Sequence, residues 1–207
     1  MTDTDHWYDG AFFDRFIAPN QDDIFAAIRK AVRPGGTVLD VGCGTGRMAF
    51  QLAGHARLVH AIDPSIRNIR RAELVWKRRG SPGGIIFTHG SAADIRVVET
   101  EPYDHAVLSY VIHEVDERAR VALLKTVAAR SRRLILADYR VPRVRGWFNM
   151  LTEAVEFAAG PDHYRGFRSF VRNGGLNDLA RASGLEVLEE LPDGPRTTQI
   201  LVLKGGA

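Results

Sequence analysis

The sequence has a single cysteine, Cys43, among its 207 residues. One cysteine excludes an intramolecular disulfide and is typical of a reducing compartment. No apolar run approaches the ~20 residues that a membrane-spanning helix needs. The first residues, 1–5, are acidic and polar, unlike those of a signal peptide. We therefore expect a cytoplasmic protein without a membrane span.

An excess of charge of one sign is also missing. The net charge is +3, with 45% hydrophobic and 26% charged residues, as in an ordinary globular protein. The length predicts one domain over residues 1–207. The densest basic group lies on a helix predicted over residues 65–79: Arg67, Arg70, Arg71, Lys77, Arg78 and Arg79. We interpret it as a solvated helix face, with a nucleic-acid footprint as the alternative.

The most informative segment is the glycine-rich turn DVGCGTG at residues 40–46. It follows a short apolar run and precedes a predicted helix. Glycines spaced by two leave no Cβ in the turn, so the backbone can lie against a ligand. The acid Asp40 would repel a phosphate but suits an ammonium group. The dinucleotide fingerprint would need a third glycine where Arg47 stands, which disfavours nicotinamide binding.

A second acid, Asp63, ends the next apolar run along the chain. In a doubly wound sheet, an acid at that position reaches the ribose hydroxyls of a nucleotide.

Strands and helices alternate along most of the chain. This alternation predicts a parallel sheet with helices on both faces. The expected strands cover residues 37–41, 58–62, 85–88, 105–110, 133–137, 185–191 and 197–203. The last two strands read as an antiparallel hairpin.

Three segments together resemble the class I S-adenosylmethionine (SAM)-dependent methyltransferases: residues 38–46, Asp63, and the turn GSAADI at residues 90–95. The resemblance implies an α/β fold, with a doubly wound, seven-stranded and mostly parallel sheet ending in an antiparallel strand. Residues 1–33 would supply N-terminal helices. Residues 141–172, which contain no good strand, read as a helical lid insertion over the site.

The resemblance also implies SAM as the cofactor. Asp40 would face the methionine ammonium group, the turn glycines would let the backbone approach the ligand, and Asp63 would accept hydrogen bonds from the ribose. Asp94 would accept from the adenine amine, although a helix N-cap explains it equally well. The full cofactor set is Asp40, Gly42, Gly44, Gly46, Asp63, Pro64, Asp94, Ile95 and Ser109.

The acceptor side is less defined. His113 follows the fourth strand, and a histidine titrates near working pH, so it is the candidate general base. Alternatively, it caps or packs the following helix. Glu114 reads as an acid in the first turn of that helix. Tyr164 is a second catalytic candidate, and no metal site is assigned. The candidate acceptor-binding residues are Tyr110, His163, Arg165 and Arg168.

We expect methyl transfer to an oxygen or carbon of a small molecule. One alternative is an RNA or protein methyltransferase that docks through the basic helix and the arginines of the insertion. Another is a non-catalytic SAM-binding module. Among partners, we expect a small-molecule acceptor and no nucleic acid, and a homodimer is compatible with the sequence.

Overall fold

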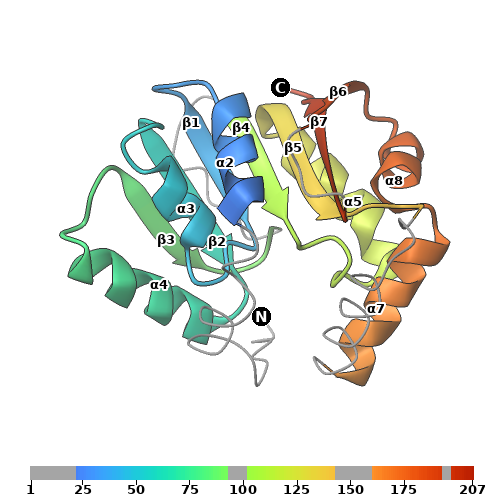
Figure 1. Ribbon diagram of the computed structural model, residues 1–207, viewed down its shortest axis with the longest axis horizontal. Helices are drawn as coiled ribbons and strands as arrows, with labels where there is room; N and C mark the ends of the chain where they lie inside the picture. Colours follow the sequence, from blue (N-terminus) through green and yellow to red (C-terminus); the bar gives the residue numbers. More distant parts are fainter. Residues whose placement is uncertain (1–21, 93–101, 143–159, 193–196) are drawn as a thin grey trace.

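A computed structural model describes residues 22–92, 102–142, 160–192 and 197–207 (Figure 1). The expected helix before residue 20 and residues 143–159 of the expected insertion lie outside these ranges. So do Asp94 and Ile95, two of the candidate cofactor-binding residues.

The described chain forms one seven-stranded sheet in the order β3-β2-β1-β4-β5-β7-β6. Neighbours among β1 to β5 run parallel, whereas β7 is antiparallel to both β5 and β6. The predicted mostly parallel sheet with an antiparallel end is therefore confirmed. The strands are β1 (Thr37–Val41), β2 (Leu58–Asp63), β3 (Ile85–His89), β4 (Tyr103–Ser109), β5 (Ser131–Tyr139), β6 (Val187–Glu190) and β7 (Thr198–Lys204).

Strand β5 is longer than the sequence predicts because it has a ladder partner on each side. Tyr103 of β4 pairs with Ser131 at its start, and Thr198 of β7 pairs with Tyr139 at its end. A central strand keeps its extended conformation wherever both neighbours supply hydrogen bonds, even beyond its apolar run. The extension carries Asp138 into the sheet, which matters for the site.

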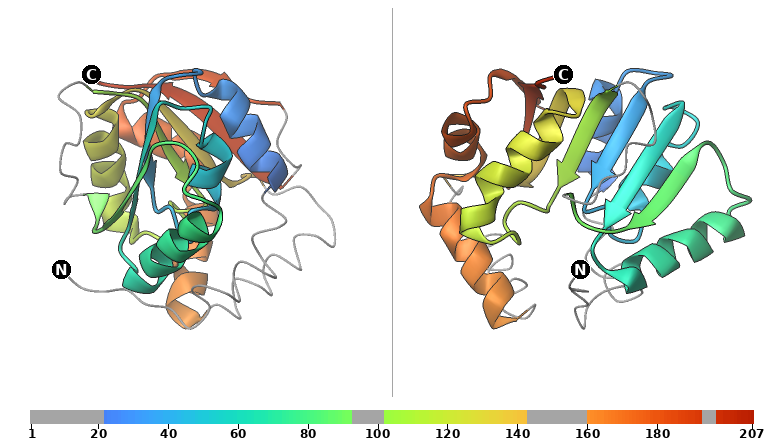
Figure 2. Two further views of the ribbon diagram at one scale, coloured as in Figure 1. Left: turned by 90° about the vertical axis from the view of Figure 1, so that its left-hand side faces the viewer. Right: turned by 180° about the vertical axis from the view of Figure 1, so that it is seen from behind.

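Helices cover both faces of the sheet (Figure 2). The described helices are α2 (Asp22–Ala31), α3 (Arg47–Leu52), α4 (Ile66–Arg78), α5 (Glu117–Ala128), α7 (Pro161–Arg172) and α8 (Gly175–Ser183). Helix α4 buries Ile69 and Ala72, whereas Arg67 and Arg70 are exposed. None of the helices in the described ranges is long and apolar enough to cross a bilayer.

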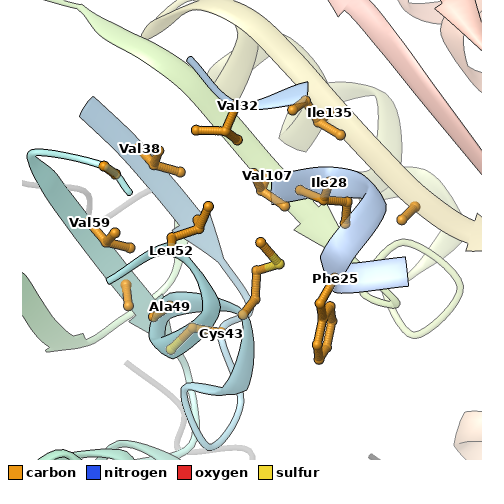
Figure 3. Close-up of a cluster of buried hydrophobic side chains, with 14 of the residues drawn as sticks. Phe25, Ile28, Val32, Val38, Cys43, Ala49, Leu52, Val59, Val107 and Ile135 are labelled. Carbon is orange, nitrogen blue, oxygen red and sulfur yellow. The ribbon is translucent and has the colours of Figure 1, made fainter. Parts of the chain in front are cut away.

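Alternate residues of the strands contribute their side chains to two separate hydrophobic cores. Val38 and Leu39 are adjacent in β1, fully buried, and belong to opposite clusters, because successive side chains of a strand point to opposite faces. The first cluster joins β1, β2, β4 and β5 to helices α2 and α3 (Figure 3). The second cluster joins the sheet to α5, α7 and α8.

Helix α7 is anchored in the second core although it lies in the expected lid insertion. Phe167 and Phe170 are 0% and 1% exposed. Gly166 lets α7 approach the turn after β4, because a Cβ there would lie 2.7 Å from the carbonyl oxygen of His113. Helix α7 is therefore packed against α5 and α8, and Gly166 brings it close to His113.

We predict that Phe170→Ala lowers the free energy of unfolding by about 3–5 kcal/mol, because a fully buried aromatic side chain leaves a cavity. Leu188→Ala, on the exposed strand β6, should change it by less than about 0.5 kcal/mol. Urea denaturation measures both. Equal and small effects would show that α7 does not belong to the folded core.

Candidate active site

The candidate residues gather at the carboxyl edge of the parallel strands. The glycine turn follows β1, Asp63 ends β2, Ser109 ends β4, and Asp138 lies near the end of β5. In open α/β sheets ligands bind at this edge, where the loops after neighbouring strands meet. The structure therefore brings the described cofactor candidates and His113 to one region of the molecule.

Asp63 holds the glycine turn in place. Its Oδ2 accepts a hydrogen bond from the backbone N–H of Gly44 at 2.8 Å. Its Oδ1 accepts from the N–H of Ser65 at 2.9 Å and from the Asn68 amide at 3.3 Å. Pro64 beside it accepts a hydrogen bond from the ring of His89 at 2.9 Å. The carboxylate is thus oriented by the protein itself at the end of β2.

The three turn glycines all have positive φ, but they meet different surroundings. A Cβ at Gly42 would overlap Val111, and one at Gly46 would lie 3.0 Å from Phe87. At Gly44 a Cβ would meet nothing within 4 Å. Protein side chains therefore occupy the space beside Gly42 and Gly46, and only Gly44 keeps an open approach of the kind a ligand could use.

Asp40 is buried without a hydrogen-bond partner for its Oδ2 among the described residues. Burial, and then the nearby Asp63, raise its pKa to about 7. A cation placed beside Asp40 would restore the ionised carboxylate and relieve the repulsion between the two acids. Ser109 also has a buried Oγ without a partner in the described chain. These atoms fit the ammonium and polar groups of a bound SAM molecule.

The hydroxyl of Tyr110 bonds to another protein side chain rather than to a ligand. That oxygen lies 2.6 Å from the hydroxyl of Thr198 on β7, and burial raises its pKa. The backbone of Tyr110 has φ 57°, a conformation that costs energy for a residue with a Cβ. Its ring lies edge-on to His113 at 6.4 Å. Only the ring remains to border an acceptor.

His113 is buried and fixed by Asp138. Its Nδ1 donates to Asp138 Oδ1 at 2.8 Å, and its backbone N–H donates to Asp138 Oδ2 at 3.2 Å. An ionised carboxylate only accepts, so the proton sits on Nδ1 and the lone pair on Nε2. His113 does not cap α5, because Asp116 holds that position and accepts from the N–H of Arg118.

Glu114 is not the first-turn helix acid that the sequence predicts, because α5 begins only at Glu117. It lies in the turn after β4, where Oε1 is 2.9 Å from His163 Nε2 and 3.8 Å from His113 Nε2. Helix α7 thus places His163 beside His113, with ring centres 5.5 Å apart.

The other candidates on α7 are Tyr164, Arg165 and Arg168. Tyr164 is half-buried and carries the guanidinium of Arg168 over its ring at 5.9 Å. Arg165 and Arg168 are exposed. Of the α7 candidates, His163 lies beside Glu114 and His113 on the acceptor side.

Arg120, which sequence reasoning missed, ties the two segments of the acceptor side together. This residue is 3% exposed and donates to the carbonyl oxygens of Val115, His113 and Gly166 at 3.0, 3.4 and 2.9 Å. The first two lie in the turn after β4 and the third in α7. An arginine inside an amphipathic helix carries no signal in the sequence, since most such arginines are solvated.

Comparisons with known proteins point to methyltransferases. The family model of a methyltransferase domain matches residues 38–133. An O-methyltransferase of Aspergillus nomiae, rstn1, is 26% identical over 163 residues, covering 73% of this chain and 71% of that protein. Another, cnsE of Penicillium expansum, is 29% identical over 112 residues, covering 54% of this chain. The chain spans only 41% of the length of cnsE.

Solved structures show the fold. The magnesium protoporphyrin IX methyltransferase of Synechocystis PCC 6803, solved with bound SAH, has a TM-score of 0.66 at 18% identity, covering 98% of this chain and 90% of that one. The mitomycin 7-O-methyltransferase MmcR has a TM-score of 0.71 at 17% identity, covering 94% of this chain and 56% of that one. The fold is thus the Rossmann-like methyltransferase fold. The methyltransferase-domain match, the O-methyltransferase relatives and the shared fold support a class I SAM-dependent methyltransferase.

Asp40→Asn should stabilise the cofactor-free protein more at pH 8 than at pH 5. A carboxyl group with a raised pKa in the folded state contributes stability that is complete below its unfolded pKa and is lost as pH rises toward 7. Asparagine removes this dependence, so the difference between pH 5 and pH 8 should be roughly 2–3 kcal/mol. Urea denaturation at both pH values measures it.

The control is Asp178→Asn, an exposed acid paired with Arg181, which should show no such pH-dependent gain. If Asp40→Asn gave the same change at both pH values, Asp40 would be ionised throughout. SAM affinity should fall in Asp40→Asn although the protein is more stable.

Alanine substitutions in the glycine turn distinguish an effect on stability from an effect on SAM binding. Gly44→Ala and Gly35→Ala should each cost about 1–2 kcal/mol, the cost of a Cβ at positive φ, because neither Cβ meets a neighbour. Gly42→Ala should cost more, because its Cβ also overlaps Val111. Of the two mildly destabilised variants, only Gly44→Ala should weaken SAM binding in calorimetry. Equal SAM affinity in Gly44→Ala and Gly35→Ala would contradict a ligand-facing Gly44.

Proposed function

We propose that the chain is a SAM-dependent methyltransferase that methylates a hydroxyl oxygen of a small molecule. The observation that carries the proposal is the buried Asp138–His113 pair at the edge of the sheet, beside the glycine turn. The relatives named as O-methyltransferases support the oxygen acceptor.

Three features of the chain would hold the cofactor. Asp40 would pair with the ammonium group, Gly44 would leave the backbone open to the ligand, and Asp63 would accept from the ribose while it orients the turn. SAM, when bound, supplies a methyl group on a sulfonium with a neutral leaving group. The protein therefore contributes mainly by aligning the acceptor with that methyl group.

His113 would remove the acceptor proton. Nε2 carries the lone pair, and Asp138 holds the ring in that tautomer and stabilises the imidazolium that forms. The acceptor oxygen gains the methyl group as its proton passes to Nε2 and the carbon–sulfur bond breaks. A base that takes the proton of an acceptor hydroxyl, as His113 would, favours O-methylation over C-methylation at this site.

The acceptor would be largely apolar or aromatic. The rings of Tyr139, Tyr110 and Phe167 lie 4.9, 6.4 and 6.5 Å from that of His113, in edge-on or tilted arrangements. Such rings favour a flat hydrophobic ligand. Tyr164, Arg165 and Arg168 would act only on a part of the acceptor that extends along α7.

From the sequence we also propose that the enzyme is cytoplasmic and does not act on nucleic acid, and a homodimer is compatible with the chain. A macromolecular acceptor is the second candidate, and the exposed arginines of α4 are the observation that favours it. It predicts salt-sensitive binding of RNA.

The test is methyl transfer from SAM to a panel of phenols and enols, with His113→Ala beside the unaltered chain. His113→Ala should lose about 10²–10⁴-fold in turnover, because a positioned general base contributes that much. Asp138→Asn should lose activity as well, since the ring is no longer held with its lone pair on Nε2.

Calorimetry with SAM, S-adenosylhomocysteine and NAD is the accompanying measurement. His113→Ala should bind SAM and S-adenosylhomocysteine as tightly as the unaltered chain does, and it should bind no NAD. Asp63→Asn should lose the affinity for SAM and S-adenosylhomocysteine. The matched control is His55→Ala, which removes a histidine whose ring bonds to the carbonyl of Val32. Full turnover in His113→Ala would rule out the base, and absent SAM binding would rule out the function.

A further inference from the structure

Three ligand-type side chains converge beside the proposed acceptor position. His113 and Glu114 come from the turn after β4, and His163 comes from the first turn of α7. One potential ligand atom of each lies within 4.8 Å of those of the other two. No other three His, Cys, Asp or Glu side chains in the described part of the chain meet in this way.

The histidine lone pair is already directed for coordination. Asp138 binds the proton of His113 Nδ1, which leaves Nε2 on the side of Glu114 and His163. Histidines that bind metals usually donate their other ring N–H to a carboxylate or carbonyl in this manner, which fixes the ring and raises its basicity. Asp138 is completely buried, so this support does not depend on solvent.

The two segments are also held at a fixed separation. Arg120 bonds to the carbonyls of His113 and Gly166, and Gly166 brings α7 against the His113 carbonyl. The side chains of His113 and His163 are 3% and 8% exposed, while that of Glu114 is 42% exposed. The group is therefore enclosed on the histidine side and open on the Glu114 side, where a further ligand could enter.

We propose that His113 Nε2, Glu114 Oε1 and His163 Nε2 bind one divalent transition-metal ion, with zinc as the expected metal. Two imidazoles and one carboxylate form a ligand set found in catalytic zinc sites, which leave the fourth position to water or substrate. Magnesium and calcium prefer oxygen ligands throughout, so this set disfavours them.

The distances suit such an ion. Ligands bound at ~2.0–2.1 Å in a tetrahedron lie about 3.3 Å apart. Glu114 Oε1 stands 2.9 Å from His163 Nε2 and 3.8 Å from His113 Nε2, on either side of that value.

This inference rests on the proposed function, because the open position would take the acceptor hydroxyl. His113, Glu114 and His163 would hold the ion, which would lower the pKa of a bound acceptor hydroxyl as zinc does for bound water. The hydroxyl proton would pass to solvent, and the oxygen would take the methyl group as the carbon–sulfur bond of SAM breaks and S-adenosylhomocysteine leaves. The general-base role of His113 applies to the metal-free protein, and His113→Ala would lose turnover in either form, because it removes either the base or a metal ligand.

The experiment is a titration of chelator-treated, full-length protein with Co²⁺, followed by visible absorption, and then competition with Zn²⁺. We expect one Co²⁺ per chain, displaced by Zn²⁺. Glu114→Gln and His163→Gln should each bind at least tenfold more weakly. His55→Ala and Glu186→Gln, which remove a histidine and an exposed acid elsewhere, should bind as the unaltered chain does.

Absence of Co²⁺ binding, or equal binding in Glu114→Gln and His163→Gln, would overturn the metal site. Thermal unfolding with and without Zn²⁺ shows whether each variant is folded, so weak binding is not mistaken for unfolding. Methyl transfer, assayed separately with metal-free and Zn²⁺-loaded protein, keeps the two proposals apart. Metal binding without any turnover would overturn the proposed function alone. Turnover in a chain that binds no Co²⁺ would overturn the metal site alone.

Discussion

Asp138 is completely buried near the end of β5, and its carboxylate accepts from the ring and backbone of His113 and from the N–H of Tyr139. Strand β5 can carry this acid into the interior because both neighbours, β4 and β7, hold its backbone beyond the apolar run. A buried charge is tolerated only where hydrogen bonds surround it. The turn after β4 supplies those bonds, so the position of His113 and the burial of Asp138 depend on each other.

The cofactor side is arranged around a different constraint. Asp40 and Asp63 are both buried at the ends of adjacent strands, and their mutual repulsion adds to the cost of burial. Asp63 is compensated by hydrogen bonds from the glycine turn and from the start of α4. Within the described residues, one oxygen of Asp40 has no hydrogen-bond partner, and burial raises its pKa to about 7. A cation beside Asp40 would favour its ionised form and offset its repulsion by Asp63.

Helix α7 completes the acceptor side of the site. Its aromatic residues enter the core, Gly166 brings its backbone against His113, and Arg120 bonds across the contact. These features explain why His163 stands beside Glu114 although it is far along the chain. The same packing encloses the imidazoles that a metal would need, and it places aromatic rings where a flat acceptor would lie.

The sequence by itself determined the class of fold and predicted the residues of the proposed cofactor side. Glycine spacing, an acid after each of two apolar runs and strand–helix alternation are local patterns, so they survive without any knowledge of packing. The acceptor half was decided only by the tertiary structure. Asp138 looks like any acid after a strand, Arg120 like any helical arginine, and Glu114 like a helix acid. Their meaning comes from β5 lying between β4 and β7 and from α7 folding back over the turn. These are contacts between distant segments, and no local pattern in the chain encodes them.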